Sequence, residues 1–206
     1  MTRPSSDQFP LRRREVAQTL LAERGDLLVI AGLGSTAWDV TAAGDHPLNF
    51  PLWGAMGGAA MIGLGLALAR PERRVLVITG DGEQLMALGA LATIAVQRPP
   101  NLVLVVFDNE RYGETGMQAT HTAHGVDLAG IAAAAGFPLA GTIRAEEELQ
   151  AARQVIRSEA GPLFYAIKVR AEPLPFVLPP KDGAHLKDRF RLALLGPDAV
   201  AAQGSS

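Results

Sequence analysis

Two polar segments of this 206-residue chain follow apolar runs and have the residue types to hold a metal ion and a phosphate. A Gly-Asp-Gly triplet centred on Asp81 follows the run Val75–Thr79, and Asn109 comes shortly after the run Leu102–Phe107. Glycines let backbone amides approach a phosphate, and a helix starting there would direct its N-terminus at it. A carboxylate repels phosphate unless a cation intervenes, so we interpret Asp81 as a Mg²⁺ ligand, with Asn109 giving a neutral oxygen.

Apolar runs alternate with helical patterns along the chain, which predicts an α/β fold: a doubly wound, mostly parallel sheet with helices on both faces. Ligands of such sheets bind outside the carboxyl ends of the strands, where Asp81 and Asn109 are expected. We expect strands over 27–31, 75–79, 102–107, 139–143 and 163–169, helices over 11–24, 54–69, 83–97, 127–135, 145–159 and 184–195, and loops over 32–53 and 108–125.

Composition excludes several classes of function. With 19 Lys and Arg against 21 Asp and Glu, the chain has no electrostatic footprint for nucleic acid or an anionic membrane. The absence of Cys excludes disulfides, thiolate metal sites and a Cys nucleophile. The uncharged segment 47–69 is long enough to span a membrane, but its prolines and glycines favour a loop and a core helix. We therefore expect a soluble, cytoplasmic protein, with Arg12–Arg14 on a solvated helix face or a subunit contact.

In this chain 26 residues (83–108) separate the triplet from Asn109. This arrangement resembles the signature of thiamine-diphosphate-dependent enzymes, in which GDG is followed by Asn at about the same spacing. The resemblance implies thiamine diphosphate and Mg²⁺ as cofactors. It also implies three metal ligands, namely the side chains of Asp81 and Asn109 and the backbone carbonyl of Arg111.

A second segment, Gly54-Ala55-Met56-Gly57, resembles the part of these enzymes that contacts the aminopyrimidine ring of the cofactor. By itself Met56 would be interpreted as core filler; the resemblance implies that it supports the bent cofactor. The cofactor-binding residues implied by both motifs are Gly54, Met56, Gly80, Asp81, Gly82, Glu83 and Asn109.

A closer resemblance, to sulfopyruvate decarboxylase β subunits and the matching half of phosphonopyruvate decarboxylase, is carried by residues 50–68, 85–95 and 101–118. It implies a pyrophosphate-binding domain over 1–170 and a Pro-rich extension with a short helix over 171–206. The implied activity is decarboxylation of a small 2-oxo acid. The Glu that activates the cofactor lies on a separate pyrimidine-binding domain, for which this chain has no room, so we expect a second subunit to carry it in a hetero-oligomer.

Several residues depart from the family pattern. Glu83 stands where a small residue is usual, so its side chain must turn away from the diphosphate or be neutralised. Glu114 alters the following loop. His121 and His124 have no family counterpart and, with Tyr112, are candidates for contact with the substrate, although no residue is assigned as catalytic.

Other functions share these motifs. A thiamine-dependent carboligase resembling acetolactate synthase would have the same signature, and a non-catalytic subunit that only holds the cofactor fits the missing Glu. A nucleotide-binding Rossmann protein is a weaker alternative, because Gly32-Leu33-Gly34 lacks the third glycine of that fingerprint.

Overall fold

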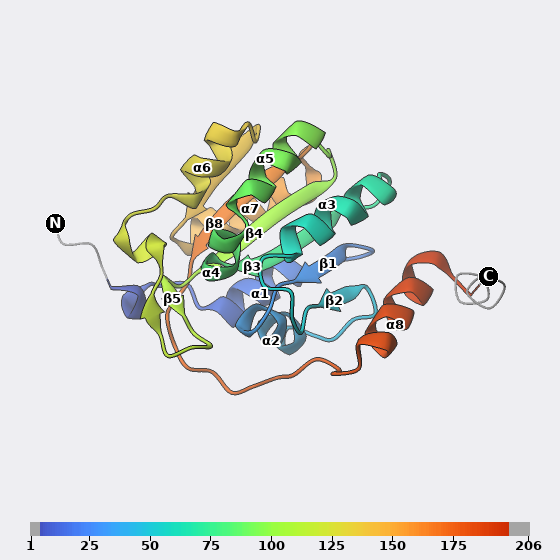
Figure 1. Cartoon of the computed structure of the whole chain (residues 1–206), viewed down its shortest axis with the longest axis horizontal. Coiled ribbons are helices and arrows are strands. Elements are labelled where there is room, and N and C mark those ends of the chain that lie inside the picture. The colour runs from blue at the N-terminus through green and yellow to red at the C-terminus, as the bar shows by residue number, and fades with distance from the viewer. Residues whose placement is uncertain (1–4, 198–206) are drawn as a thin grey trace.

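A six-stranded parallel sheet forms the centre of the molecule in the computed structural model, which describes residues 5–197 (Figure 1). The strand order is β2-β1-β3-β4-β8-β7, and every neighbouring pair is parallel. The predicted doubly wound α/β fold is thus confirmed. The strands are β1 (Leu28–Ala31), β2 (Asn49–Pro51), β3 (Val75–Gly80), β4 (Leu102–Asp108), β7 (Leu139–Ile143) and β8 (Leu163–Lys168), and a separate hairpin consists of β5 (Arg111–Tyr112) and β6 (Gln118–Ala119).

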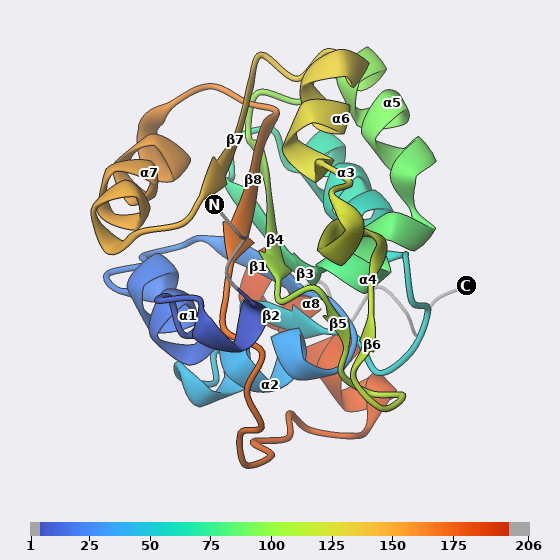
Figure 2. The ribbon, with the colours of Figure 1, turned by 90° about the vertical axis from the view of Figure 1, so that its left-hand side faces the viewer.

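Helices cover both faces of the sheet, as Figure 2 shows. One face carries α1 (Arg13–Leu21), α2 (Ser35–Ala42) and α7 (Glu146–Ser158), and the other carries α3 (Ala59–Ala69), α5 (Leu88–Gln97) and α6 (Leu128–Ala135). The central strands β3, β4 and β8 are therefore buried on both faces. This double burial explains why they are nearly continuous apolar runs in the sequence.

Two expected loops contain regular structure, so those predictions were wrong. The segment 32–53 contains α2 and the three-residue edge strand β2, and 108–125 contains the β5–β6 hairpin and the 3₁₀ helix η2 (His121–His124). These short elements have little periodicity of their own. Neighbouring segments stabilise them: α1 packs on α2, β1 pairs with β2, and β5 pairs with β6, which contacts η2.

Two expected helices have different bounds. The helix over 54–69 begins only at Ala59, because the preceding loop has left-handed backbone at Ala55 (φ +56°) and Gly57 (φ +92°). The helix over 83–97 is two helices, α4 (Asp81–Met86) and α5, which are separated at Ala87 (φ −120°, ψ 38°). Gly80 is the last residue of β3, and Asp81 and Gly82 of the triplet begin α4.

The chain after β8 crosses the carboxyl end of the sheet and ends in α8 (Gly183–Leu195), close to the predicted bounds (Figure 1). The Asp182 side chain caps α8 by accepting the amides of residues 184 and 185 at 2.9 and 3.1 Å. Phe190 packs edge-on against Phe50 of β2 with ring centroids 5.5 Å apart. The helix therefore covers the edge strand, which would otherwise expose unpaired backbone.

Within residues 5–197, no helix is both long enough and apolar enough to span a membrane. The uncharged segment 47–69 is divided between β2, a loop and the eleven-residue helix α3, as expected for a loop and a core helix.

Two glycines of α3 provide a test of how this helix packs on the sheet. A Cβ at Gly63 would lie 2.2 Å from Val77 Cγ2, whereas a Cβ at Gly65 has no atom within 4 Å. We expect Gly63→Ala to lower the free energy of unfolding by about 1–3 kcal/mol through overpacking. Gly65→Ala should raise it by about 0.5–1 kcal/mol through helix propensity. Urea unfolding measures both, and equal effects would contradict the described packing.

Candidate functional site

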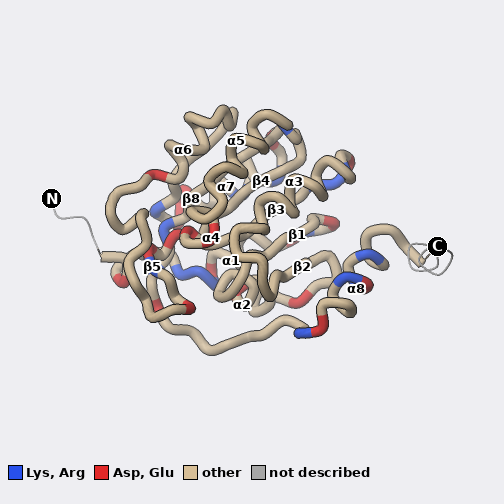
Figure 3. The backbone as a smooth tube through the Cα atoms, viewed as in Figure 1, with Lys and Arg blue, Asp and Glu red and all other residues tan. Residues whose placement is uncertain are grey.

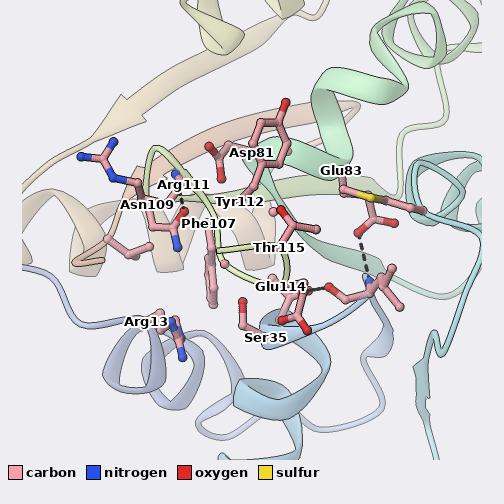
Figure 4. Close-up of a pocket in the computed structure, with 17 residues that line it drawn as sticks. Arg13, Ser35, Asp81, Glu83, Phe107, Asn109, Arg111, Tyr112, Glu114 and Thr115 are labelled. Carbon is pink, nitrogen blue, oxygen red and sulfur yellow. Dashed lines mark hydrogen bonds between the residues drawn. The ribbon is translucent and has the colours of Figure 1, made fainter. Parts of the chain in front are cut away.

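A cavity of about 250 Å³ opens at the carboxyl end of the sheet. It lies where the strand order reverses, since β2 and β3 flank β1 on opposite sides, and this is the place at which open α/β sheets bind ligands. Figure 4 shows the side chains that converge there from segments far apart in the chain. The lining residues are Arg13, Leu33, Ser35, Thr36, Met56, Gly80, Asp81, Gly82, Glu83, Phe107, Asn109, Arg111, Tyr112, Gly113, Glu114, Thr115 and Val169.

Asp81, the first residue of α4, is a buried carboxylate in this cavity. Its Oδ2 accepts hydrogen bonds from the hydroxyls of Thr120 at 2.6 Å and Thr122 at 3.2 Å. Burial away from water and the neighbouring Asp108 carboxylate raise the pKa of Asp81 to about 7. Among residues 5–197, no Lys or Arg forms an ion pair with it. A buried carboxylate in this position is suited to bind a cation.

The neighbouring acidic residues do have a counter-ion, Lys168 at the end of β8. Its Nζ lies 2.5 Å from Asp108 Oδ2 and 3.0 Å from Glu110 Oε1, and all three side chains are buried. The Thr122 hydroxyl lies between the two carboxylates, 2.7 Å from Asp108 Oδ1 and 3.2 Å from Asp81 Oδ2, and has one proton to share between them. Lys168 was not among the predicted site residues. The signal was present, because a charged residue ends an apolar strand there as Asp108 does in β4.

Asn109 and Arg111 present oxygen atoms on one side of the β5–β6 hairpin. The Arg111 amide donates to Asn109 Oδ1 at 2.9 Å. The carbonyls of Glu110 and Tyr112 accept hydrogen bonds from the segment that pairs with them. Alternate residues of a strand direct their carbonyls to opposite sides, so the Arg111 carbonyl faces away from β6, on the side of Asn109.

This oxygen set, one carboxylate, one amide and one carbonyl, suits a hard cation that keeps oxygen ligands from a bound phosphate. A site built from protein side chains alone is not present in the described part of the chain, where no three His, Asp or Glu residues are grouped to hold a metal ion. The predicted ligands Asp81, Asn109 and Arg111 all line one cavity; their role as ligands stays a prediction.

The two glycines of the triplet differ in their surroundings. A Cβ at Gly82 would lie 2.7 Å from Tyr112 Cε1, so close packing with this ring requires a glycine. A Cβ at Gly80 would have no atom within 4 Å, and its backbone (φ −96°, ψ 160°) suits any residue. Gly80 therefore leaves open space in the cavity, which is the room that a bound diphosphate would need.

Glu83 is buried and its carboxylate accepts hydrogen bonds from three uncharged donors. Oε2 accepts from the Leu33 amide at 3.1 Å and from Thr79 Oγ1 at 2.7 Å, while Oε1 accepts from the Gly57 amide at 3.2 Å. Figure 4 shows this side chain directed at the segment that follows β1. Glu83 therefore contacts the protein itself, and its partners Leu33, Gly57 and Thr79 were not predicted.

Met56 lines the cavity, and its Cε lies 3.8 Å from the position of a Cβ at Gly82. We call it, together with the exposed Trp53, Met86 and Met117, the apolar rim; Trp53 lines a smaller pocket that shares Leu33 and Glu114 with the cavity. Met86 adjoins Gly57, and Met117 Sδ lies 3.9 Å from the position of a Cβ at Gly113. Gly54 is not among the cavity residues, so a contact from its carbonyl to a ligand stays a prediction.

Arg13 is buried and lines the cavity, which corrects the expectation of a solvated helix face for this residue. Its Nε lies 2.6 Å from Oδ2 of Asp39, a fully buried residue of α2, because α1 packs against that helix. Arg12 does lie on the surface, where it pairs with Glu172 at 2.7 Å. Arg14 also pairs with the Asp39 carboxylate, at 3.1 Å, but stays partly exposed, and nothing in the local pattern of three arginines indicates which of them turn to Asp39.

Arg13 and Arg111 thus supply two cations to a cavity that also holds acidic residues. Figure 4 shows Arg13 beside Ser35 of α2, across the cavity from Asp81. Figure 3 shows acidic and basic positions close together around β5, at this end of the sheet.

The three candidates for substrate contact lie in different parts of the structure. Tyr112 lines the cavity, whereas His121 and His124 lie exposed on η2 and are not among the lining residues. Glu114 is exposed at the cavity mouth, with its Oε1 2.9 Å from the position of a Cβ at Gly34.

The amino-acid sequence of this chain matches one protein family and several known enzymes. The model of one protein family, described as thiamine pyrophosphate enzyme, C-terminal TPP binding domain, matches residues 33–167. Sulfopyruvate decarboxylase subunit beta of Methanothermobacter thermautotrophicus is 39% identical over 160 residues, covering 78% of this chain and 83% of that subunit. Phosphonopyruvate decarboxylase of Streptomyces hygroscopicus is 34% identical over 201 residues, covering 97% of this chain and 50% of that protein.

Among solved structures, benzoylformate decarboxylase from Polynucleobacter necessarius has the same fold, with a TM-score of 0.67 at 20% identity. The match covers 85% of this chain and 36% of that one. This chain therefore spans most of the length of the subunit beta relative, but half of the phosphonopyruvate decarboxylase and about a third of the solved enzyme.

The raised pKa of Asp81 predicts a stability effect in the chain without metal or ligand. Ionising this residue is harder in the fold than in the unfolded chain, so stability falls as pH rises from 3.8 to about 7. We expect Asp81→Asn to raise the free energy of unfolding by about 1–3 kcal/mol at about pH 8, and the gain should vanish near pH 4.

Asp108→Asn is the matched control, because it removes one of the two carboxylates that pair with Lys168 and should lower the free energy of unfolding by about 1–3 kcal/mol. Urea unfolding across this pH range measures both variants. A loss of stability in Asp81→Asn at every pH would contradict the account of its burial.

Proposed function

The chain belongs to the thiamine pyrophosphate enzyme family, whose C-terminal TPP binding domain matches residues 33–167, and we propose that it is the Mg²⁺- and thiamine-diphosphate-binding subunit of a two-subunit 2-oxo acid decarboxylase. The observation that carries this proposal is the cavity in which Asp81, Asn109 and Arg111 lie together beside the open space at Gly80. In this organisation residues 1–170 form the cofactor-binding domain. Residues 171–206 form an extension, of which 198–206 lie outside the described residues.

Asp81, Asn109 and the Arg111 carbonyl would hold the metal ion, and the ion would neutralise the Asp81 charge that the fold leaves without a counter-ion. Thiamine diphosphate, when bound, supplies a thiazolium carbon that adds to a keto group and accepts the electrons released with CO₂. Ser35, at the N-terminus of α2, and Arg13 face the same cavity and would stabilise the anionic diphosphate.

The other end of the site would be completed by a partner subunit with a pyrimidine-binding domain and the activating Glu. Two observations support this: Trp53, Met56, Met86 and Met117 leave an apolar rim exposed at the cavity, and one relative is named as a subunit. Exposed apolar side chains gathered in this way are typical of a surface that another protein covers. Covering the rim would also exclude water from the reacting groups.

A small 2-oxo acid is the proposed substrate, since two relatives are named for decarboxylating sulfopyruvate and phosphonopyruvate. Tyr112 lines the cavity and is the chain's candidate to contact it. Arg111 would attract an anionic substituent of that acid.

Gly80→Ala tests whether the open space beside Asp81 receives the diphosphate. Its methyl group meets no protein atom, so the free energy of unfolding should stay within about 1 kcal/mol of the unchanged chain. The same methyl group would occupy the room left for the ligand, and we expect the affinity for thiamine diphosphate with Mg²⁺ to fall at least about tenfold.

Titration calorimetry measures this affinity, and Gly89→Ala is the control, because Gly89 also has no atom near its Cβ position but lies outside the cavity. Equal affinity in the two variants would mean that the diphosphate does not bind beside Gly80.

The proposed assembly is tested by native mass spectrometry of the complex purified from its own cells. We expect a second, different subunit and one thiamine diphosphate with one Mg²⁺ per pair. Assays of this pair with 2-oxo acids should release CO₂, whereas this chain alone should be inactive. A homo-oligomer without either cofactor would overturn the proposal, and a product longer than the substrate would indicate a carboligase.

A further inference from the structure

We propose that Glu83 is a positioning residue that fixes two cofactor-facing loops before the cofactor binds. The loops are the β1 loop (residues 32–34) and the Met56 loop (residues 54–58). This inference rests on the proposed function, because it assigns to Glu83 a role in preparing that same site. It gives the side chain no direct contact with the cofactor.

The contacts of Glu83 connect segments that are far apart in the sequence. Its carboxylate accepts the amide of Leu33, which lies 50 residues before it, and the amide of Gly57, which lies 26 residues before it. The Thr79 hydroxyl on β3 donates to the same carboxylate at 2.7 Å. One side chain on α4 therefore joins both loops to the central strand of the site.

Burial makes these contacts strong. Glu83 is 4% exposed, and within residues 5–197 no Lys or Arg side chain forms an ion pair with it. A buried carboxylate requires hydrogen-bond donors, and bonds to a charged acceptor are about twice as strong as neutral ones. The loops supply those donors, so a loop that moved away would leave the charge poorly satisfied.

The amides that Glu83 binds lie close in sequence to residues that face the cavity. Gly57 directly follows Met56, and Leu33 comes two residues before Ser35, where α2 begins. The carbonyls of Gly32 and Leu33 also accept the Thr36 hydroxyl, at 2.8 and 3.3 Å, so the β1 loop is held from both ends. Fixing these loops in advance avoids the entropy loss of ordering them when a ligand binds.

Gly32 completes the arrangement. A Cβ there would lie 2.0 Å from Glu83 Oε2 and 2.9 Å from Thr79 Oγ1. Any larger residue would therefore displace the carboxylate from the Leu33 amide. The need for glycine at position 32 is thus tied to the presence of Glu83, and this dependence can be measured.

The first test is hydrogen exchange of the chain without cofactor, followed by titration with thiamine diphosphate and Mg²⁺. In the unchanged chain the amides of Leu33 and Gly57 should be protected. Glu83→Ala should speed their exchange at least about tenfold and weaken cofactor affinity about 10- to 100-fold, as supporting residues of binding sites do. Glu83→Gln, which keeps one acceptor oxygen, should restore part of both.

Gln84→Ala is the matched control, because Gln84 is also buried on α4 but donates only to the Ala87 carbonyl of the same segment. It should leave the exchange of both loop amides unchanged. Unprotected Leu33 and Gly57 amides in the unchanged chain would overturn the proposal without any variant.

The second test is the coupling between positions 32 and 83. Gly32→Ala alone should weaken cofactor affinity as strongly as Glu83→Ala does. In the Glu83→Ala background it should add less than about twofold, because the carboxylate oxygen 2.0 Å from the added Cβ is gone and only the Thr79 hydroxyl, at 2.9 Å, remains close. Additive losses would overturn the proposal.

Failure of this inference differs from failure of the proposed function. If the unchanged chain binds thiamine diphosphate and the Glu83 variants bind it equally well, the inference alone is wrong. If the unchanged chain and its complex bind none, the proposed function is wrong.

Discussion

The parallel register of three central strands determines the chemistry of this molecule. Gly80 pairs with Phe107 across β3 and β4, and Asp108 pairs with Lys168 across β4 and β8. The residues that follow the strand ends are therefore neighbours, which brings the Asp81 carboxylate close to Asp108 in a buried place. Like charges at this distance need a cation, and Lys168 supplies one for Asp108 from the adjacent strand.

Three buried acidic side chains around the cavity are satisfied in different ways. Asp108 has an ion pair with Lys168, Glu83 has two backbone amides and a hydroxyl, and Asp81 has two hydroxyls. Of these three carboxylates, Asp81 is the one that has neither an ion pair with a cation nor a hydrogen bond from another residue's backbone amide. In the proposed function a metal ion would therefore bind at Asp81, since the neighbouring carboxylates already have partners within the fold.

The two sides of the cavity at this end of the sheet differ in how they are held. Strand ends and the Glu83 contacts hold the metal-facing side of the cavity, whereas Trp53, Met56, Met86 and Met117 remain exposed around its mouth. A site that is ordered on one side and apolar on the other fits an enzyme completed by a second protein surface. A site completed by a second protein surface agrees with the relatives. One of them is named as a subunit, and another is a chain about twice as long as this one.

The sequence by itself determined the α/β class, the central strands and the metal-site candidates. Strands buried on both faces are continuous apolar runs, and Asp81 and Asn109 follow two of them at a recognisable spacing. It did not reveal α2, β2 or the β5–β6 hairpin, whose short segments are stabilised by neighbours distant in the chain. Tertiary structure alone decided that Arg13 turns inward, that Glu83 binds the amides of Leu33 and Gly57, and that the exposed His121 and His124 lie outside the cavity. These outcomes depend on which segments meet, and local sequence patterns do not encode the contacts between segments 26 to 50 residues apart.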